Sequence, residues 1–294
     1  MMNRRKFIQS TVATSLVLGL TSRALANLGP AESYIKNIGL QAYTLRDLLV
    51  SDPEGTLKAV ADAGYKQVEL YNFPNCDPLI KGAKDAGLKI SSSHFDAGSI
   101  LDPQDKSYAA FMKILEKAKA NGMEHLVVPY LPDTFRKTAD DWKKTAENLN
   151  VAAAKSKEAG IQLAYHNHNF EFHPMEDGTT GYDIFMKEFS PDMQFEIDLF
   201  WVKVAGLEPA ELIKKLKGRV SQLHIKDLKK GIQTPNFGGI PGDAFQEVGN
   251  GVLDWKPIFE AAKASGVKNC HVEQDQSPDP LGSIKTSIAF LQKL

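Results

Sequence analysis

Four residues of types that commonly bind divalent metals follow four successive β-type segments of the chain. They are His166, Asp198, His224 and Glu273. Two imidazoles and two carboxylates suit Mn2+, Zn2+, Fe2+ or Co2+ better than Ca2+, which prefers oxygen alone. Any one of them would be a weak signal, but together they predict a site for one divalent metal ion. Because the set contains no thiolate, a structural zinc site is not expected.

Other polar residues lie at the ends of similar segments. They include Gln41, Glu69, His94, His168 and Lys226. The two-residue repeat of a strand places Glu196 on the face of Asp198, and Gln222 on the face of His224 and Lys226. A buried ion without a partner costs several kcal/mol, and one cation is the simplest shared partner for carboxylates and imidazoles.

The elements that must position these residues follow a repeated pattern, in which a helix-like stretch and a glycine precede a short apolar strand. Glycine adopts the left-handed conformation that ends a helix at little cost. The expected strands are 38–42, 67–70, 89–92, 125–128, 162–165, 194–198, 220–224 and 270–273. The expected helices include 57–63, 108–120, 142–159, 212–216, 255–265 and 284–294.

Alternation of this kind predicts a parallel sheet with right-handed crossovers. Eight strand–helix units in about 250 residues match a single (β/α)8 TIM barrel, in which chemistry is built at the carboxyl ends of the strands. An open doubly wound sheet is the alternative. The segment Gln41–Thr44 after the first strand lacks the glycine-rich turn of a dinucleotide site, so we favour the barrel.

Residues 1–26 read as a signal peptide of the twin-arginine type, and residues 27–294 as the barrel domain. Arg4 and Arg5 precede an apolar run at 11–20, and Ala24–Ala26 forms a small-residue cleavage pattern. We therefore expect export to the periplasm. The apolar run is too short for a lasting membrane span, which needs about 20 apolar residues; a retained anchor is the alternative.

The composition excludes several classes of protein. Thirty-five basic against 36 acidic residues leave a net charge of −1, so no cationic surplus is available for nucleic acid. The two cysteines, Cys76 and Cys270, are too few for a zinc-finger framework, and we expect each to be a packed apolar residue.

The chain resembles the xylose isomerase-like TIM barrel superfamily, which includes the sugar phosphate isomerase/epimerase group. The resemblance is carried by LAYHNHNFEF (163–172), EIDLFW (196–201), LHIKD (223–227), VGNG (248–251) and VEQD (272–275). It implies a single divalent metal bound by Asp198, His224 and Glu273. At the first ligand position relatives commonly have Glu-Asn-His, whereas this chain has His166-Asn167-His168.

The resemblance implies a carbohydrate isomerase or epimerase that moves a proton next to a carbonyl through a metal-stabilised enediolate. Glu273 is then the expected base, with His168 or Glu171 replacing the missing carboxylate. Lys226 is a further catalytic candidate. Gln41, Glu69 and His94 are expected to bind a keto sugar or keto-glycoside, and Trp201 to form an apolar wall.

Three other functions compete with this prediction. A lyase or hydratase eliminating the aglycone of a 3-keto-glycoside would use the same enediolate. An endonuclease-type phosphodiesterase is disfavoured because the chain lacks a basic stripe. A periplasmic sugar-binding protein is disfavoured because nothing divides the chain into two lobes. A homodimer is the default expectation for quaternary structure.

Overall fold

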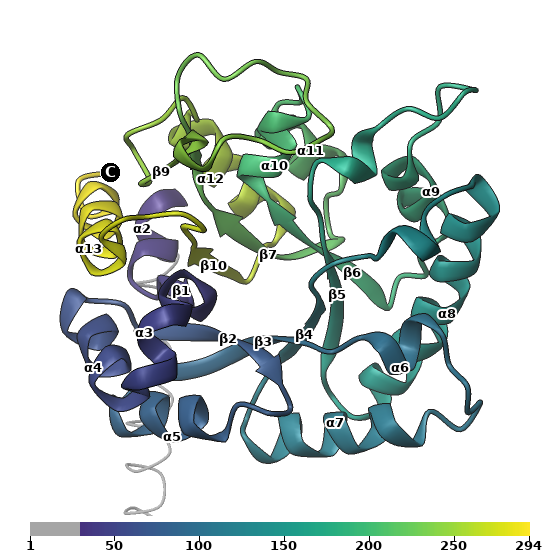
Figure 1. The fold of residues 1–294 in the computed structure, drawn as a ribbon, viewed down its shortest axis with the longest axis horizontal. Coiled ribbons are helices and arrows are strands. Elements are labelled where there is room, and N and C mark those ends of the chain that lie inside the picture. Colours follow the sequence, from purple (N-terminus) through teal and green to yellow (C-terminus); the bar gives the residue numbers. More distant parts are fainter. Residues whose placement is uncertain (1–29) are drawn as a thin grey trace, which may run out of the picture.

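Eight parallel strands close into a barrel in the computed structural model, which describes residues 30–294 (Figure 1). The strands are β1 (Gly39–Gln41), β2 (Gln67–Phe73), β3 (Lys89–Phe95), β4 (His125–Val128), β5 (Gln162–His166), β6 (Met193–Asp198), β7 (Val220–Ile225) and β10 (Asn269–Val272). Pairing of β10 with β1, at Val272 and Leu40, closes the ring. The predicted TIM barrel is confirmed, and the open-sheet alternative is wrong.

Helices surround this ring (Figure 1). They are α2 (Pro30–Ile35), α3 (Arg46–Ser51), α4 (Pro53–Ala63), α5 (Asp77–Asp85), α6 (Gly98–Leu101), α7 (Ala109–Ala120), α8 (Ala139–Glu158), α9 (Gly181–Glu188), α10 (Leu199–Val204), α11 (Pro209–Lys215), α12 (Trp255–Ser265) and α13 (Pro280–Leu291). Among residues 30–294, none of these helices combines the length and the apolar character that a bilayer crossing requires. The predicted signal peptide lies outside the described residues.

Capping explains where the helices begin and end. The expected helix at 57–63 begins four residues earlier, because Asp52 accepts a hydrogen bond from the Gly55 amide and Pro53 fits the first turn. Gly64, with φ of 112°, ends the same helix. The expected helix at 284–294 likewise begins at Pro280 behind the Asp279 cap.

Two strands, β2 and β3, extend three residues beyond their predicted ends. The sequence suggests 67–70 and 89–92, whereas pairing of β2 with β3 continues to Phe73 and Phe95 through two register shifts. This extension places His94 within β3 rather than after it. A short antiparallel pair, β8 (Asp227–Leu228) and β9 (Phe245–Gln246), also lies in the segment after β7.

Polar side chains meet inside the barrel, whereas the apolar core lies between the strands and the helices. Gln222 of β7 contacts Glu69 of β2, Ser92 of β3 and Glu196 of β6. Alternate strand residues such as Leu163 and Leu223 are buried in the apolar core. Cys76 and Cys270 are also buried and free, as predicted.

Candidate active site

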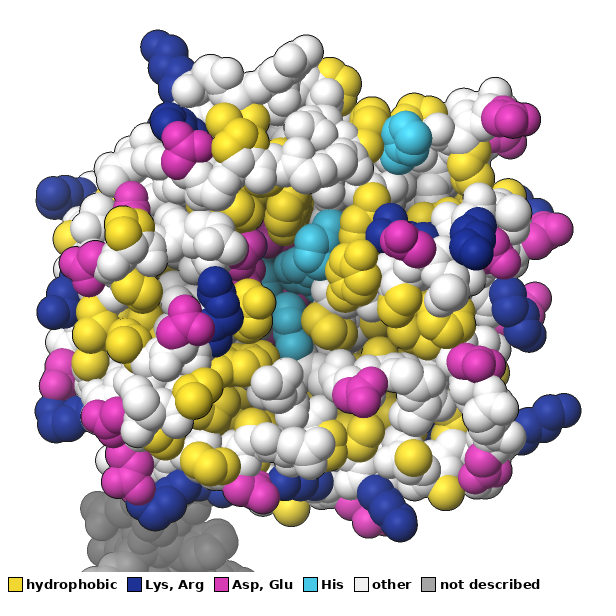
Figure 2. Space-filling model, in the orientation of Figure 1, with side chains coloured by type: hydrophobic (Ala, Val, Ile, Leu, Met, Phe, Trp, Pro, Cys, Tyr) yellow, Lys and Arg dark blue, Asp and Glu magenta, His cyan; other side chains and the backbone are white. Residues whose placement is uncertain are grey.

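A cavity of about 830 Å3 opens at the carboxyl ends of the strands. Figure 2 shows histidine and acidic side chains at the base of a central hollow, with apolar side chains around it. Six of the predicted site residues line the cavity, namely His94, His166, His168, Trp201, Lys226 and Glu273. The strand ends thus form a pocket of the size that binds small molecules.

The predicted metal ligands come together at this pocket. His166, Asp198, His224 and Glu273 each offer one ligand atom, and these four atoms lie within 4.8 Å of one another. His166 Nε2 lies 3.4 Å from Asp198 Oδ2, and His224 Nδ1 lies 2.9 Å from Glu273 Oε2. All four residues are buried. We call this set the outer group.

Unpartnered atoms of the outer group fit a metal ion. Neither ring nitrogen of His166 has a hydrogen-bond partner among the described residues. Asp198 Oδ2 accepts no well-aligned hydrogen bond within residues 30–294, although Lys226 Nζ lies 3.1 Å away. Leaving such atoms unsatisfied costs about 1–3 kcal/mol each. A divalent cation would satisfy Asp198 Oδ2 and one ring nitrogen of His166, and the mixed donor set suits the metals predicted above.

Lys226 lies beside the outer group and is almost completely buried. Its Nζ lies 2.7 Å from Glu273 Oε2 and 2.9 Å from Asp275 Oδ2. Burial alone would lower the pKa of Lys226, but the charges of Asp198, Asp275 and Glu273 outweigh burial and raise this pKa well above its usual value. The side chain is therefore protonated in the folded protein and places a positive charge at the pocket wall.

His168 forms another part of the pocket wall. Its ring stacks on Phe170 at 5.5 Å and lies 5.4 Å from Trp201, between ring centroids. Burial lowers the pKa of His168 well below its usual value, and His166 and Lys226 act in the same direction. The imidazole is therefore neutral in the folded protein. Its buried Nδ1 has no hydrogen-bond partner in the described part of the chain.

A second layer of polar residues lies beneath the outer group. Glu69 Oε1 accepts a hydrogen bond of 2.8 Å from Gln41 Nε2, and both residues are fully buried. Neither is among the described residues that line the pocket. Their direct binding of substrate stays a prediction. His94, which does line the pocket, lies 2.9 Å from Glu196 in this layer.

Three residues of the site received no role from the sequence. The strand repeat placed Glu196 and Gln222 on the faces of Asp198 and His224, but it did not show their contacts. Across the barrel, Gln222 Nε2 donates hydrogen bonds to both Glu69 and Glu196. Asp275 follows Glu273 by two residues. That spacing was its only signal, because Asp275 lies beyond the end of β10.

Glu171 is separated from the pocket. A 3-10 turn, η3 (Phe170–Phe172), directs its carboxyl group toward Tyr165, whose hydroxyl donates a 2.8 Å hydrogen bond. The backbone amide of His168 donates a second bond of 2.8 Å. Within residues 30–294 Glu171 is not part of the pocket lining. The carboxyl group therefore fixes the segment that carries His168, and its role in proton transfer stays a prediction.

Glu171 should make the stability of the protein depend on pH. Burial raises its pKa from 4.5 to about 8, although the bonds from Tyr165 and His168 act against burial. Between these pH values the folded protein keeps a proton that the unfolded chain releases, so the free energy of unfolding should fall as the pH rises. This loss in the free energy of unfolding is at most on the order of 4–5 kcal/mol.

Urea unfolding of the chelator-treated protein from pH 5 to pH 9 measures this effect against Glu171→Gln. The variant should gain stability relative to the natural chain as the pH rises. Glu176→Gln, on an exposed loop of the same segment, is the control and should show no such gain. Parallel pH curves for the natural chain and Glu171→Gln would show that the carboxyl group is ionised when folded.

Comparison with known proteins agrees with this architecture. Residues 57–294 match the family described as Xylose isomerase-like TIM barrel. An inosose dehydratase from Lacticaseibacillus casei is 27% identical over 243 residues, covering 74% of this chain and 80% of the relative. An inosose dehydratase from Clostridium perfringens is 26% identical over 249 residues, covering 76% of this chain and 83% of that relative.

A solved structure is similar along nearly the same length. The sugar phosphate isomerase/epimerase from Parabacteroides distasonis superposes with a TM-score of 0.69 at 28% identity, covering 87% of this chain and 93% of that one. The family match at residues 57–294 includes the strands that carry the outer group. The chain therefore belongs to the xylose isomerase-like TIM barrel family.

Proposed function

We propose that the protein is a metal-dependent carbon–oxygen lyase. Its substrate would be a keto-polyol or keto sugar, from which it removes a β-substituent as water or as an alcohol. The observation that carries the proposal is the position of His168 and Lys226, which both line the pocket. Lys226 also contacts Asp198 and Glu273 of the outer group. The relatives named inosose dehydratase support elimination over isomerisation, which the resemblance alone had favoured.

Elimination needs one proton acceptor and one proton donor. The acceptor takes the proton from the carbon beside the carbonyl, the carbon–oxygen bond at the next carbon breaks, and the departing oxygen receives a proton. The products are an enone and water or an alcohol. We assign His168 as the acceptor and Lys226 as the donor, because both line the pocket. His168 also has a ring nitrogen without a hydrogen-bond partner among residues 30–294.

The outer group would hold the metal for this reaction. A divalent cation bound by His166, Asp198, His224 and Glu273 would stabilise negative charge that develops on the carbonyl oxygen. An epimerase that moves a proton between two faces benefits from two similar bases. His166 stands where relatives commonly have glutamate, so this chain lacks one of the two carboxylates.

Isomerisation or epimerisation of a keto sugar is the second candidate. The 28% identical isomerase/epimerase structure supports it, and both reactions begin with removal of the same proton. Incubation in D2O with Mn2+ or Co2+, an inosose and a panel of keto sugars and 3-keto-glycosides separates the two. A lyase yields an ultraviolet-absorbing enone and releases water or the alcohol. Deuterium in a product of unchanged skeleton would identify an isomerase or epimerase instead.

The assigned base gives a specific prediction. His168→Gln should lower kcat about 10²- to 10⁴-fold, the range for loss of a general base, while metal content stays unchanged. His173→Gln is the matched control, because His173 lies on the same segment and is exposed. A His168→Gln enzyme with kcat within threefold of the natural enzyme would remove His168 from the mechanism.

A further inference from the structure

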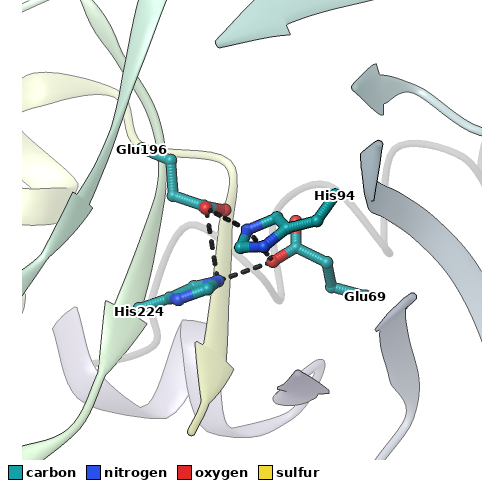
Figure 3. Close-up of side chains that lie close together, drawn as sticks. All are labelled: Glu69, His94, Glu196 and His224. Carbon is teal, nitrogen blue, oxygen red and sulfur yellow. Dashed lines mark hydrogen bonds and ion pairs between the residues drawn. The ribbon is translucent and has the colours of Figure 1, made fainter. Parts of the chain in front are cut away.

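Four residues below the outer group form a second set of ligand atoms. Glu69 of β2, His94 of β3, Glu196 of β6 and His224 of β7 offer atoms that lie within 4.8 Å of one another (Figure 3). We call this set the inner group. It shares His224 with the outer group, using Nε2 instead of Nδ1.

Each ring nitrogen in the inner group faces two carboxylate oxygens. His94 Nε2 lies 2.9 Å from Glu196 Oε2 and 3.4 Å from Glu69 Oε1. His224 Nε2 lies 2.5 Å from Glu69 Oε1 and 3.3 Å from Glu196 Oε2. A ring nitrogen carries at most one proton, so it can donate a well-aligned hydrogen bond to only one of the two carboxylate oxygens. A cation at the centre would contact all four atoms.

These separations fit a small cation. Nitrogen and oxygen ligands bound at about 2.0–2.2 Å in a tetrahedron lie about 3.3–3.5 Å apart. Two of the four separations match this range, and the other two are shorter, so little movement is needed to admit an ion. Figure 3 shows the two carboxylates and the two rings directed toward the same point.

The surroundings orient the carboxylates toward that point. Gln222 Nε2 lies 2.7 Å from Glu69 Oε2 and 2.6 Å from Glu196 Oε1, which are the oxygens directed away from the histidines. Glu69 Oε1 and Glu196 Oε2 therefore face the rings. Because both glutamates are fully buried, their two negative charges need positive charge nearby.

An ion can reach the inner group from the pocket. His94 lines the cavity and its side chain is 12% exposed, whereas Glu69, Glu196 and His224 are completely covered. His94 thus lies between the pocket and the covered residues. Exchange of the ion would require this ring to move, and the rest of the group could stay in place.

We propose that Glu69, His94, Glu196 and His224 form a second divalent-cation site directly beneath the first. Two nitrogens and two carboxylate oxygens are a donor set suited to Zn2+ or Co2+. When both sites are filled, His224 binds one ion through each ring nitrogen and carries no ring proton. The second ion neutralises the buried glutamates and fixes the orientation of His224 toward the outer group.

Zinc stoichiometry tests the proposal. The full chain is stripped with a chelator, reloaded with Zn2+, desalted and analysed by plasma mass spectrometry. The natural chain should retain two zinc ions, and His94→Gln and Glu196→Gln one each. Asp198→Asn, which alters only the outer group, should also retain one. His125→Gln, a buried histidine on β4 outside both groups, is the matched control and should retain two.

One zinc ion in the natural chain, unchanged in His94→Gln and Glu196→Gln, would overturn the second site. Titration of the natural chain with Co2+ gives a second measurement that needs no variant. The visible absorption should stop rising after two equivalents, and a break at one would also overturn the proposal. Two bound ions without lyase activity would instead contradict only the proposed function, so the two failures are distinguishable.

Discussion

Asp198→Asn is expected to lower turnover about 10³-fold or more. The outer group would lose a negatively charged ligand, and metal-assisted charge stabilisation supplies several kcal/mol of the barrier reduction. With Oδ1 held by the Trp201 amide, the substitution replaces Oδ2, the oxygen without a well-aligned hydrogen bond, with an NH2 group that cannot bind a cation. Turnover and metal content should therefore fall together.

The fold should survive this change. Asp198 Oδ1 accepts a 3.1 Å hydrogen bond from the Trp201 amide at the start of α10, and asparagine caps a helix as well as aspartate. Asp279→Asn is the control, since Asp279 also caps a helix and lies on the exposed surface. Steady-state kinetics, metal analysis and melting curves give the result. Full activity in Asp198→Asn would contradict the outer metal site.

Lys226→Met should damage both stability and activity. It leaves Asp198, Glu273 and Asp275 without their shared cation, and breaking a buried ion pair costs about 3–5 kcal/mol. Loss of the assigned proton donor should also lower kcat about 10²- to 10⁴-fold. Urea unfolding and kinetics on metal-loaded protein measure the two effects separately.

A double variant separates the two roles of Lys226. Adding Asp275→Asn to Lys226→Met removes one unpaired charge without restoring a donor, so stability should recover in part while kcat stays low. Asp275→Asn alone is the control for that carboxylate. If activity returned together with stability, Lys226 would be a structural residue and the donor would have to be found elsewhere.

The sequence predicted the barrel because its signals are local. Two local signals indicate that helices and strands alternate: the glycines that end helices, and the short apolar runs that form strands. Parallel pairing of the strands then brings their carboxyl ends together. His166, Asp198, His224 and Glu273 lie at such ends, so their meeting followed from the topology. Two-residue strands such as β8 and β9 carry no comparable periodicity.

The features of the site that the sequence did not predict depend on contacts between side chains that are distant in the chain or fixed by packing. Glu196 and Gln222 are single polar residues inside strands, and only the closed ring shows that they face Glu69. Glu171 is three residues from His168 in sequence, yet the η3 turn directs it to Tyr165. Sequence proximity cannot show this, because the direction of a side chain in a tight turn depends on packing.

Closure of the ring has a consequence for when the ion is captured. Glu273 follows β10, the last strand, which must pair with β7 and β1 before its carboxylate joins the donors from β5, β6 and β7. A partly folded chain with β10 undocked offers three of the four donors. An ion that four donors bind more tightly than three would shift the equilibrium toward the docked strand. Metal binding and the docking of β10 would then be thermodynamically linked.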